Sequence, residues 1–277
     1  MQKNEITEYH IYTRLASRCT NPHNASILSQ VGGDERRHYN ILKAHTNVEV
    51  TPSRFRVFLF TLMARFFGLT FSLKLMENGE KDAEGIYDEM CGDFPEAAVI
   101  SKEEEDHEHE LLNMIDEEAL KHMGSVVLGL NDALVELSGA LAGFTFAIQN
   151  SRTIALMGLI TGVAATFSMA ASEFLSQRQD GEGADALKSS VYTGIAYIGT
   201  VVLLVLPFML FTNPFVSLAI MMATALLIIL VFNFYISVAK DLPFRRRFLE
   251  MASISVGVAA LSFCIGWVVR TVWGLDI

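Results

Sequence analysis

The sequence predicts an all-α protein in which a four-helix bundle, residues 1–120, precedes a five-helix transmembrane domain, residues 121–277. Three observations predict this architecture. Residues 1–120 contain 22 Asp+Glu against 12 Lys+Arg, whereas residues 121–277 contain nine of each. The second part holds five apolar runs long enough for a helix to cross a hydrocarbon core of ~30 Å. The first part repeats apolar residues at the three- and four-residue spacing of amphipathic helices.

The net negative charge of the first part indicates which kinds of partner it can bind. Phosphate backbones select basic surfaces, so the charge argues against nucleic acid and is compatible with a metal cation. The three cysteines (Cys19, Cys91 and Cys264) form no Cys-x-x-Cys pair. Their spacing therefore excludes a zinc ribbon and gives no disulfide framework.

The N-terminal part contains four helical patterns, at about 4–18, 25–46, 54–91 and 96–120. One of them carries a Glu-x-x-His motif on its apolar face. In "DERRH", residues 34–38, Glu35 and His38 occupy positions where the apolar stripe should continue. A buried carboxylate or imidazole costs free energy unless it is paired or bound to a metal. The motif therefore predicts a metal ligand pair on the second helix.

A second Glu-x-x-His motif lies in "EEEDHEHELL", residues 103–112. Glu104 and His107 continue the apolar face of the fourth helix. The competing register, Asp106 with His109, would continue through charged residues, so Glu104 and His107 are favoured. Two such motifs, each preceded by a helix with a Glu in register, predict a metal centre rather than a solvated charged face.

The other two helices each supply a carboxylate. Glu8 shares a face with apolar residues of the first helix. On the third helix Glu77, Glu80 and Glu84 compete; Glu80 is favoured, with Glu77 as an additional ligand. One Glu from each of two helices and one Glu-x-x-His from each of two others is the ligand arrangement of di-iron carboxylate bundles. The predicted metal ligands are Glu8, Glu35, His38, Glu77, Glu80, Glu104 and His107.

Mixed carboxylate and imidazole ligands favour Fe²⁺, with Mn²⁺ or Zn²⁺ as alternatives in its place. Over about 115 residues this part resembles the rubrerythrin and erythrin branch of the ferritin-like superfamily. The resemblance implies a di-iron site and leaves open whether the bundle oxidises iron.

Five spans are predicted in the C-terminal part, at about 124–148, 153–177, 190–211, 215–238 and 250–273. Lys and Arg are more frequent in the loops that lie on the same side as the N-terminus. The positive-inside rule then predicts a multi-pass protein of the cell (inner) membrane with a cytoplasmic N-terminal domain and an outside C-terminus. A further apolar stretch, residues 52–72, is interrupted by three arginines, and Arg65 near its centre would be costly in lipid. We expect this stretch to be an amphipathic segment on the membrane surface or on a partner subunit.

Ionisable residues inside predicted spans are candidates for a transport path. Asp132 and Glu136 lie one turn apart on the first span, and Met169 and Glu173 lie one turn apart on the second. Carboxylates suit a hard or borderline cation, and a thioether adds a soft ligand that favours iron-like metals. Two GxxxG motifs, at 139–143 and 158–162, predict close helix approach within a pair or across a dimer.

At "NDALVELSGALAG" (131–143) and "FSMAASEFLS" (167–176) the chain resembles the vacuolar iron transporter family over about 150 residues. The resemblance implies a five-span homodimer that exchanges Fe²⁺ or Mn²⁺ for protons, with the family's first-span aspartate at Asp132 and its second-span methionine at Met169. Thr161 stands where the family has a pore glutamate. The long helices that the family carries between spans two and three are also missing here.

The whole architecture resembles the membrane-bound ferritin fusions of bacteria, which implies export of Fe²⁺ from the cytoplasm. We therefore expect a proton-coupled exporter in the lipid bilayer whose N-terminal bundle captures the metal. The alternative is a membrane-anchored di-iron oxidase or peroxidase of the rubrerythrin type. Carboxylates inside the spans favour transport, because an anchor does not need them.

Overall fold

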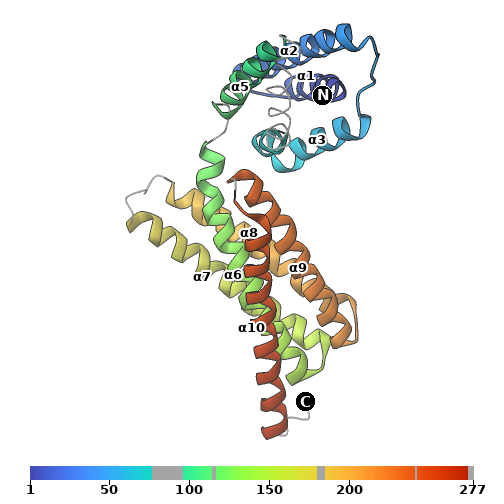
Figure 1. The fold of residues 1–277 in the computed structure, drawn as a ribbon. Coiled ribbons are helices and arrows are strands. Elements are labelled where there is room, and N and C mark those ends of the chain that lie inside the picture. Colours follow the sequence, from blue (N-terminus) through green and yellow to red (C-terminus); the bar gives the residue numbers. More distant parts are fainter. Residues whose placement is uncertain (77–95, 114–116, 180–184, 241, 274–277) are drawn as a thin grey trace. The chain divides into compact units, whose positions relative to one another are not determined.

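The computed structural model of the 277-residue chain describes residues 1–76, 96–113, 117–179, 185–240 and 242–273 (Figure 1). All regular structure in these residues is α-helical, which confirms the predicted fold class. The chain divides into two compact units. The first contains Met1–Asp116 and the second nearly all of Glu117–Ile277.

The N-terminal unit contains helices α1 (Gln2–Ala16), α2 (Pro22–Thr46), α3 (Arg54–Phe67) and α5 (Ala97–Asn113), and residues 69–76 are also helical. Local signals set the ends of α2. The Asn21 side chain caps its first turn by accepting the His23 N–H at 2.9 Å, and the helix ends at Asn47 in the left-handed conformation, with φ 52°. Helix α1 packs against α2 and α3, and α2 packs against α5. The shared core is formed by Ile11, Tyr12, Leu15, Leu28, Val31, Val57, Phe60, Leu73, Met76 and Leu111.

The third helix is shorter than the sequence predicts. The sequence predicts a single helix over 54–91, but α3 ends at Phe67 because Gly68 adopts φ 92°, a backbone conformation that a continuing α-helix does not contain. The helical residues that follow Gly68 are described only as far as Met76.

The C-terminal unit consists of α6 (Glu117–Ile148), α7 (Ser151–Gln179), α8 (Ala186–Leu210), α9 (Pro214–Ala239) and α10 (Phe244–Trp273). Each contains a segment long and apolar enough to cross a membrane, which confirms the five predicted spans: Met123–Ile148, Ser151–Gln179, Ala186–Leu210, Pro214–Ala239 and Phe244–Val272.

Helix α6 is the central element of this unit, because it packs against α7, α8 and α10 (Figure 1). Both GxxxG motifs lie at contacts between helices of the same chain. An added Cβ on Gly143 of α6 would lie 3.1 Å from the Ser262 carbonyl oxygen of α10, and one on Gly162 of α7 would lie 2.5 Å from Val201 Cγ1 of α8. Small residues thus allow these helices to approach closely inside one subunit.

Candidate metal centre

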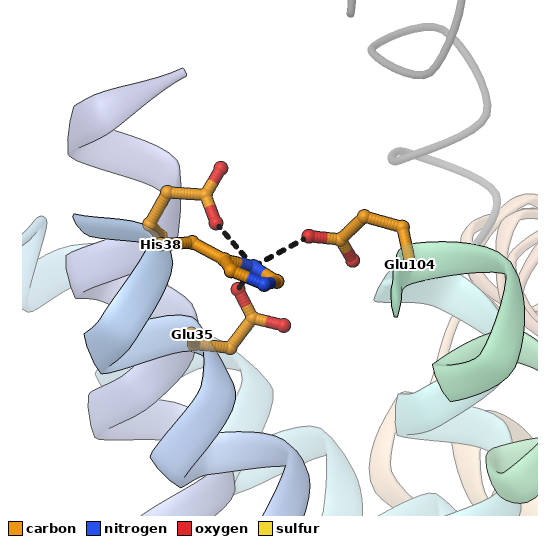
Figure 2. A group of neighbouring side chains, drawn as sticks. Glu35, His38 and Glu104 are labelled. Atoms are coloured by element: carbon orange, nitrogen blue, oxygen red, sulfur yellow. Dashed lines mark hydrogen bonds and ion pairs between the residues drawn. The ribbon is translucent and has the colours of Figure 1, made fainter. Parts of the chain in front are cut away.

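Four side chains from three helices meet inside the N-terminal unit. Glu5 lies on α1, Glu35 and His38 lie on α2, and Glu104 lies on α5. Each offers one ligand atom, and these atoms all lie within 4.8 Å of one another. Figure 2 shows the carboxylates of Glu35 and Glu104 facing the His38 ring from α2 and α5. Such a group could hold a metal ion.

The Nδ1 atom of His38 is the centre of this group. It lies 3.0 Å from Glu104 Oε1, 3.6 Å from Glu5 Oε2 and 3.8 Å from Glu35 Oε2. The His38 side chain is fully buried, and Glu5 and Glu35 are nearly so. Three carboxylates around one buried imidazole are unfavourable without protons or a cation between them.

His107 has an equivalent environment on α5. Its Nδ1 atom lies 3.4 Å from Glu35 Oε1 and 3.6 Å from Glu104 Oε2, and its ring is stacked on that of His38 at 5.9 Å between centroids. Glu35 and Glu104 therefore each direct one oxygen toward His38 and the other toward His107. Glu35, Glu104, His38 and His107 are therefore the residues that would hold metal here, and they are the ligand types found in di-iron carboxylate bundles.

The second nitrogen of each ring faces an outer carboxylate on the opposite helix. His38 Nε2 lies 2.8 Å from Glu103 Oε2 of α5, and His107 Nε2 lies 3.2 Å from Asp34 Oδ2 of α2. Arg37 pairs with both carboxylates, at 2.8 Å from Asp34 and 2.6 Å from Glu103. An imidazole that donates its second N–H to a carboxylate is held in one orientation, with the other nitrogen directed at a metal.

Burial and mutual repulsion change the protonation of these groups. Burial, together with the charges of Glu104 and Glu5, raises the pKa of Glu35 well above its usual value. Burial lowers the pKa of His38, but hydrogen bonds to Glu104, Glu5 and Glu103 outweigh it and raise that pKa to about 10. Without a metal, the centre therefore holds a proton on His38 at neutral pH, and Glu35 retains its proton to higher pH than a solvated carboxyl group does.

Glu104 behaves in the opposite way. Burial raises its pKa, but the neighbouring imidazoles of His107 and His38 outweigh this effect and lower the pKa to about 2. The carboxylate that faces both imidazoles is thus ionised at neutral pH.

The residues present fit a divalent metal. Within the described part of the chain, Glu35 Oε2 and His107 Nδ1 are buried and make no hydrogen bond. Buried polar atoms are rarely left unsatisfied unless a ligand or water completes them. Carboxylate oxygens and imidazole nitrogens are the donors that Fe²⁺, Mn²⁺ and Zn²⁺ accept.

The position predicted on the first helix lies outside the tight group. Glu8 is buried, but its Oε1 lies 3.5 Å from Arg56 Nη2, and Glu5, one turn earlier, takes the place beside His38. Burial and the charge of Glu5 raise the pKa of Glu8 to about 8, against the opposing charge of Arg56. Glu5 could have been found from its spacing, because it precedes Glu8 by three residues on the same face.

Three predicted or competing positions, Glu77, Glu80 and Glu84, lie outside the described residues, so their role as ligands stays a prediction. Asp34 and Glu103 were missed. The signal for them was the acidic residue directly before the glutamate of each Glu-x-x-His motif.

The C-terminal unit has its own polar groups on α6. Asp132 is half-buried, and Glu136 is exposed and accepts a hydrogen bond from the hydroxyl of Tyr197 of α8 at 3.2 Å. Tyr197 is fully buried and was not anticipated from the sequence. A buried tyrosine hydroxyl needs a partner, and this one holds a carboxylate within a candidate span.

The polar residues of α7 are placed differently. Glu173 is buried and accepts hydrogen bonds from the Ser125 hydroxyl at 2.6 Å and from the Gln177 amide at 3.1 Å. Met169 is partly buried and packs against the apolar core of the unit. The buried glutamate is therefore fixed by the neighbouring helix α6, where Ser125 lies.

A segment that includes most of α6 and all of α7 is similar to a known protein family. Residues 123–186 match the VIT family. The matched segment contains all four residues predicted for a transport path: Asp132, Glu136, Met169 and Glu173. No curated protein matches the chain significantly. The VIT-family match and the five candidate spans support a multi-pass membrane protein that transports metal ions.

Within the VIT-family segment, Thr161 stands where the resemblance expects a glutamate. Its hydroxyl donates hydrogen bonds to the carbonyl oxygens of Met157 and Gly158, one turn back on α7. This position therefore supplies no charge to the matched segment, in which the carboxylates predicted for a transport path are Asp132, Glu136 and Glu173.

Proposed function

We propose that the chain exports Fe²⁺, or Mn²⁺ in its place, from the cytoplasm by exchange for protons. In this proposal the N-terminal unit is a ferritin-like module that captures the metal in the cytoplasm, and the C-terminal unit carries it across the inner membrane. The C-terminus then lies outside.

Capture is supported by the cluster around His38 and His107. Glu35 and Glu104 each face both imidazoles, so the arrangement suits two cations that share two carboxylates. One outer carboxylate behind each imidazole adds the orientation that a metal ligand needs. Glu5 supplies a further carboxylate beside His38, and Glu77 and Glu80 stay predicted ligands.

Passage through the membrane is supported by the carboxylates of α6. A partly dehydrated cation needs anionic oxygen in place of its lost hydration shell, and Asp132 and Glu136 provide it. We assign Asp132 as the obligatory transport carboxylate. Met169 and Glu173 of the neighbouring helix α7 are assigned to the same path.

Exchange for protons follows from the chemistry of the same carboxylates. A proton and a metal ion compete for the oxygens of one carboxylate, so binding of one displaces the other. Residues that bind the cargo can therefore also couple its movement to a pH gradient.

A homodimer is supported by the exposure of Glu136. This carboxylate lies on a candidate span and is exposed in the single chain. An ionised side chain facing lipid costs several kcal/mol, about 2.5–3.5 on insertion scales. A second copy that covers this face of α6 would remove the cost and enclose a polar path. The GxxxG motifs give no support for this contact, because they are used inside one subunit.

A membrane-anchored di-iron oxidase or peroxidase is the second candidate function, and the paired-histidine cluster favours it. The two candidates differ in what they require of α6. An oxidase needs the cluster alone, whereas a transporter also needs the carboxylates of the spans.

The observation that carries the proposal is Glu136, held by buried Tyr197 within the segment that matches the VIT family. The test is Fe²⁺ flux into proteoliposomes of the full chain with and without an inward-acidic pH gradient. We expect flux that requires the gradient and that is lost in Glu136→Gln and Asp132→Asn, while Glu250→Gln, a surface control on α10, transports normally. Metal-stimulated oxygen consumption with no flux would instead establish the oxidase.

A further inference from the structure

Helix α3 has two faces, and only one of them belongs to the core of the N-terminal unit. Val57, Phe60 and Thr61 are buried against the rest of the unit. The opposite face carries large apolar side chains that are exposed to solvent: Phe55 is 72 %, Phe58 59 % and Leu62 37 % exposed. Phe66, one turn further on, is 73 % exposed. These four positions follow the helical repeat, so they form one continuous apolar stripe, here called the α3 stripe.

Two arginines lie along one edge of the α3 stripe. Arg54 and Arg65 are both exposed, and they lie eleven residues apart on the same edge of the helix. No residue in the described ranges forms an ion pair with either of them. Arg56 is directed inward instead, with its guanidinium 2.9 Å from the Asn4 side chain and 3.5 Å from Glu8. The outward charge of α3 is therefore positive, and it borders the apolar face.

The net charge of this segment is positive, whereas the net charge of the surrounding N-terminal part is negative. Residues 50–76 contain four Lys+Arg and no Asp or Glu, although residues 1–120 together carry ten more acidic than basic residues. An exposed aromatic stripe beside basic residues matches a bilayer surface, where acyl chains take up the rings and anionic headgroups attract the arginines.

The segment that connects the N-terminal unit to the first candidate span is short. Helix α5 ends at Asn113, and the first candidate span begins at Met123. Nine intervening residues tether the N-terminal unit to the lipid. A tether this short raises the effective concentration of the α3 stripe at the membrane surface, so weak interfacial affinity is sufficient.

We infer that α3 is an interfacial helix, which places Phe55, Phe58, Leu62 and Phe66 in the acyl–headgroup boundary of an anionic leaflet and directs Arg54 and Arg65 to lipid phosphates. This inference requires that the five candidate spans lie in a bilayer. It does not require that the chain transports metal. The N-terminal unit would then contact the membrane through α3, in addition to its covalent link to the first candidate span.

The inference is tested with the full chain in lipid nanodiscs. In a background of Cys19→Ser, Cys91→Ser and Cys264→Ser, a single cysteine is placed at Leu62 on the stripe, or at Asn40, an exposed control on α2, and labelled with an environment-sensitive fluorophore. Nanodiscs contain phosphatidylcholine with or without phosphatidylglycerol, and their acyl chains are brominated or unbrominated. All the substituted stripe and control positions are exposed, so the fold is retained.

We expect bromine to reduce the fluorescence at position 62 in anionic discs and to leave position 40 unchanged. Adding Arg54→Gln and Arg65→Gln should reduce the quenching at position 62. Equal fluorescence with and without bromine at position 62 would overturn the inference, as would equal quenching at position 40. Oxidative crosslinking of Leu62→Cys between two chains, without quenching, would show that a second copy covers the stripe instead. Quenching that is unaffected by the arginine substitutions would overturn the assignment of lipid phosphate.

Discussion

Each histidine of the candidate metal centre uses its two ring nitrogens for different partners. The Nδ1 atoms face the shared carboxylates of Glu35 and Glu104, and the Nε2 atoms face Glu103 and Asp34 across the helix pair. The motifs on α2 and α5 thus complete one another, because each supplies the outer carboxylate for the other's imidazole.

The outer carboxylates should therefore matter for metal affinity although they hold no metal themselves. Asp34→Asn and Glu103→Gln each remove the charge behind one imidazole, and loss of such a partner typically lowers affinity about 10–100-fold. We expect that loss in Mn²⁺ titrations of the full chain. Glu105→Gln is the matched control, since Glu105 is exposed on α5. Equal affinities for Asp34→Asn, Glu103→Gln and the control would contradict the assignment.

Metal binding should release protons. His38, whose pKa is raised to about 10, is protonated at neutral pH, and it must lose that proton before Nδ1 can bind a cation. Because protons compete with metal, affinity should rise with pH and level off above about pH 10. Calorimetric titration at pH 7 in buffers of different ionisation enthalpy should show at least one proton released per first metal. Identical heats in all buffers would refute this.

The residues of the centre were only partly predictable. Glu35, His38, Glu104 and His107 follow from two motifs that placed charge on apolar helix faces, and the structure brings all four together. The choice between Glu5 and Glu8 did not follow. Both lie on one face of α1, and which of them reaches His38 depends on the axial offset between α1 and α2, which periodicity does not encode.

At the scale of elements, glycines decide how closely α7 approaches α8. A Cβ on Gly162 would lie 2.5 Å from Val201 Cγ1 and 3.3 Å from Val201 Cβ, so a branched side chain close to the backbone would have to move. Overpacking of this kind costs about 1–3 kcal/mol.

We expect Gly162→Ala to lower the thermal unfolding midpoint of the protein in detergent. The matched control is Gly199→Ala on α8, where an added Cβ meets nothing within 4 Å and helix propensity improves by up to about 1 kcal/mol. A Gly162→Ala variant as stable as Gly199→Ala would show that α7 and α8 are not in the contact described.

The presence of the helices was more predictable than the positions where they end. The five spans follow from hydropathy and length alone, and the structure confirms them. The break at Gly68 was missed, because an apolar pattern that continues on both sides of a glycine reads as one helix unless the left-handed φ of that residue is known.

In the proposed function, the N-terminal unit captures the metal and the C-terminal unit carries it across the membrane. The two functions should then be separable by substitution. His38→Ala with His107→Ala removes both imidazoles of the centre and leaves the α6 carboxylates intact. Asp132→Asn removes charge from α6 at nearly constant volume and leaves the centre intact.

The proposed homodimer can be tested independently of the metal centre. If a second copy covers Glu136, native mass spectrometry of the protein in detergent should show a dimer. Glu136→Leu, which replaces the exposed carboxylate by an apolar side chain, removes the cost of exposing it and should increase the monomer fraction. A wild-type protein that is monomeric at all concentrations would contradict the enclosed path.

Metal content and Fe²⁺ flux should be measured on the same proteoliposome preparations of the wild type, Asp132→Asn and the His38→Ala/His107→Ala variant. We expect Asp132→Asn to retain the metal of the N-terminal unit and to lose flux. We expect the histidine variant to lose the bound metal and to keep a reduced flux at high Fe²⁺ concentration. Wild-type flux in Asp132→Asn would contradict the assigned path, and unchanged metal content in the histidine variant would contradict the assigned centre.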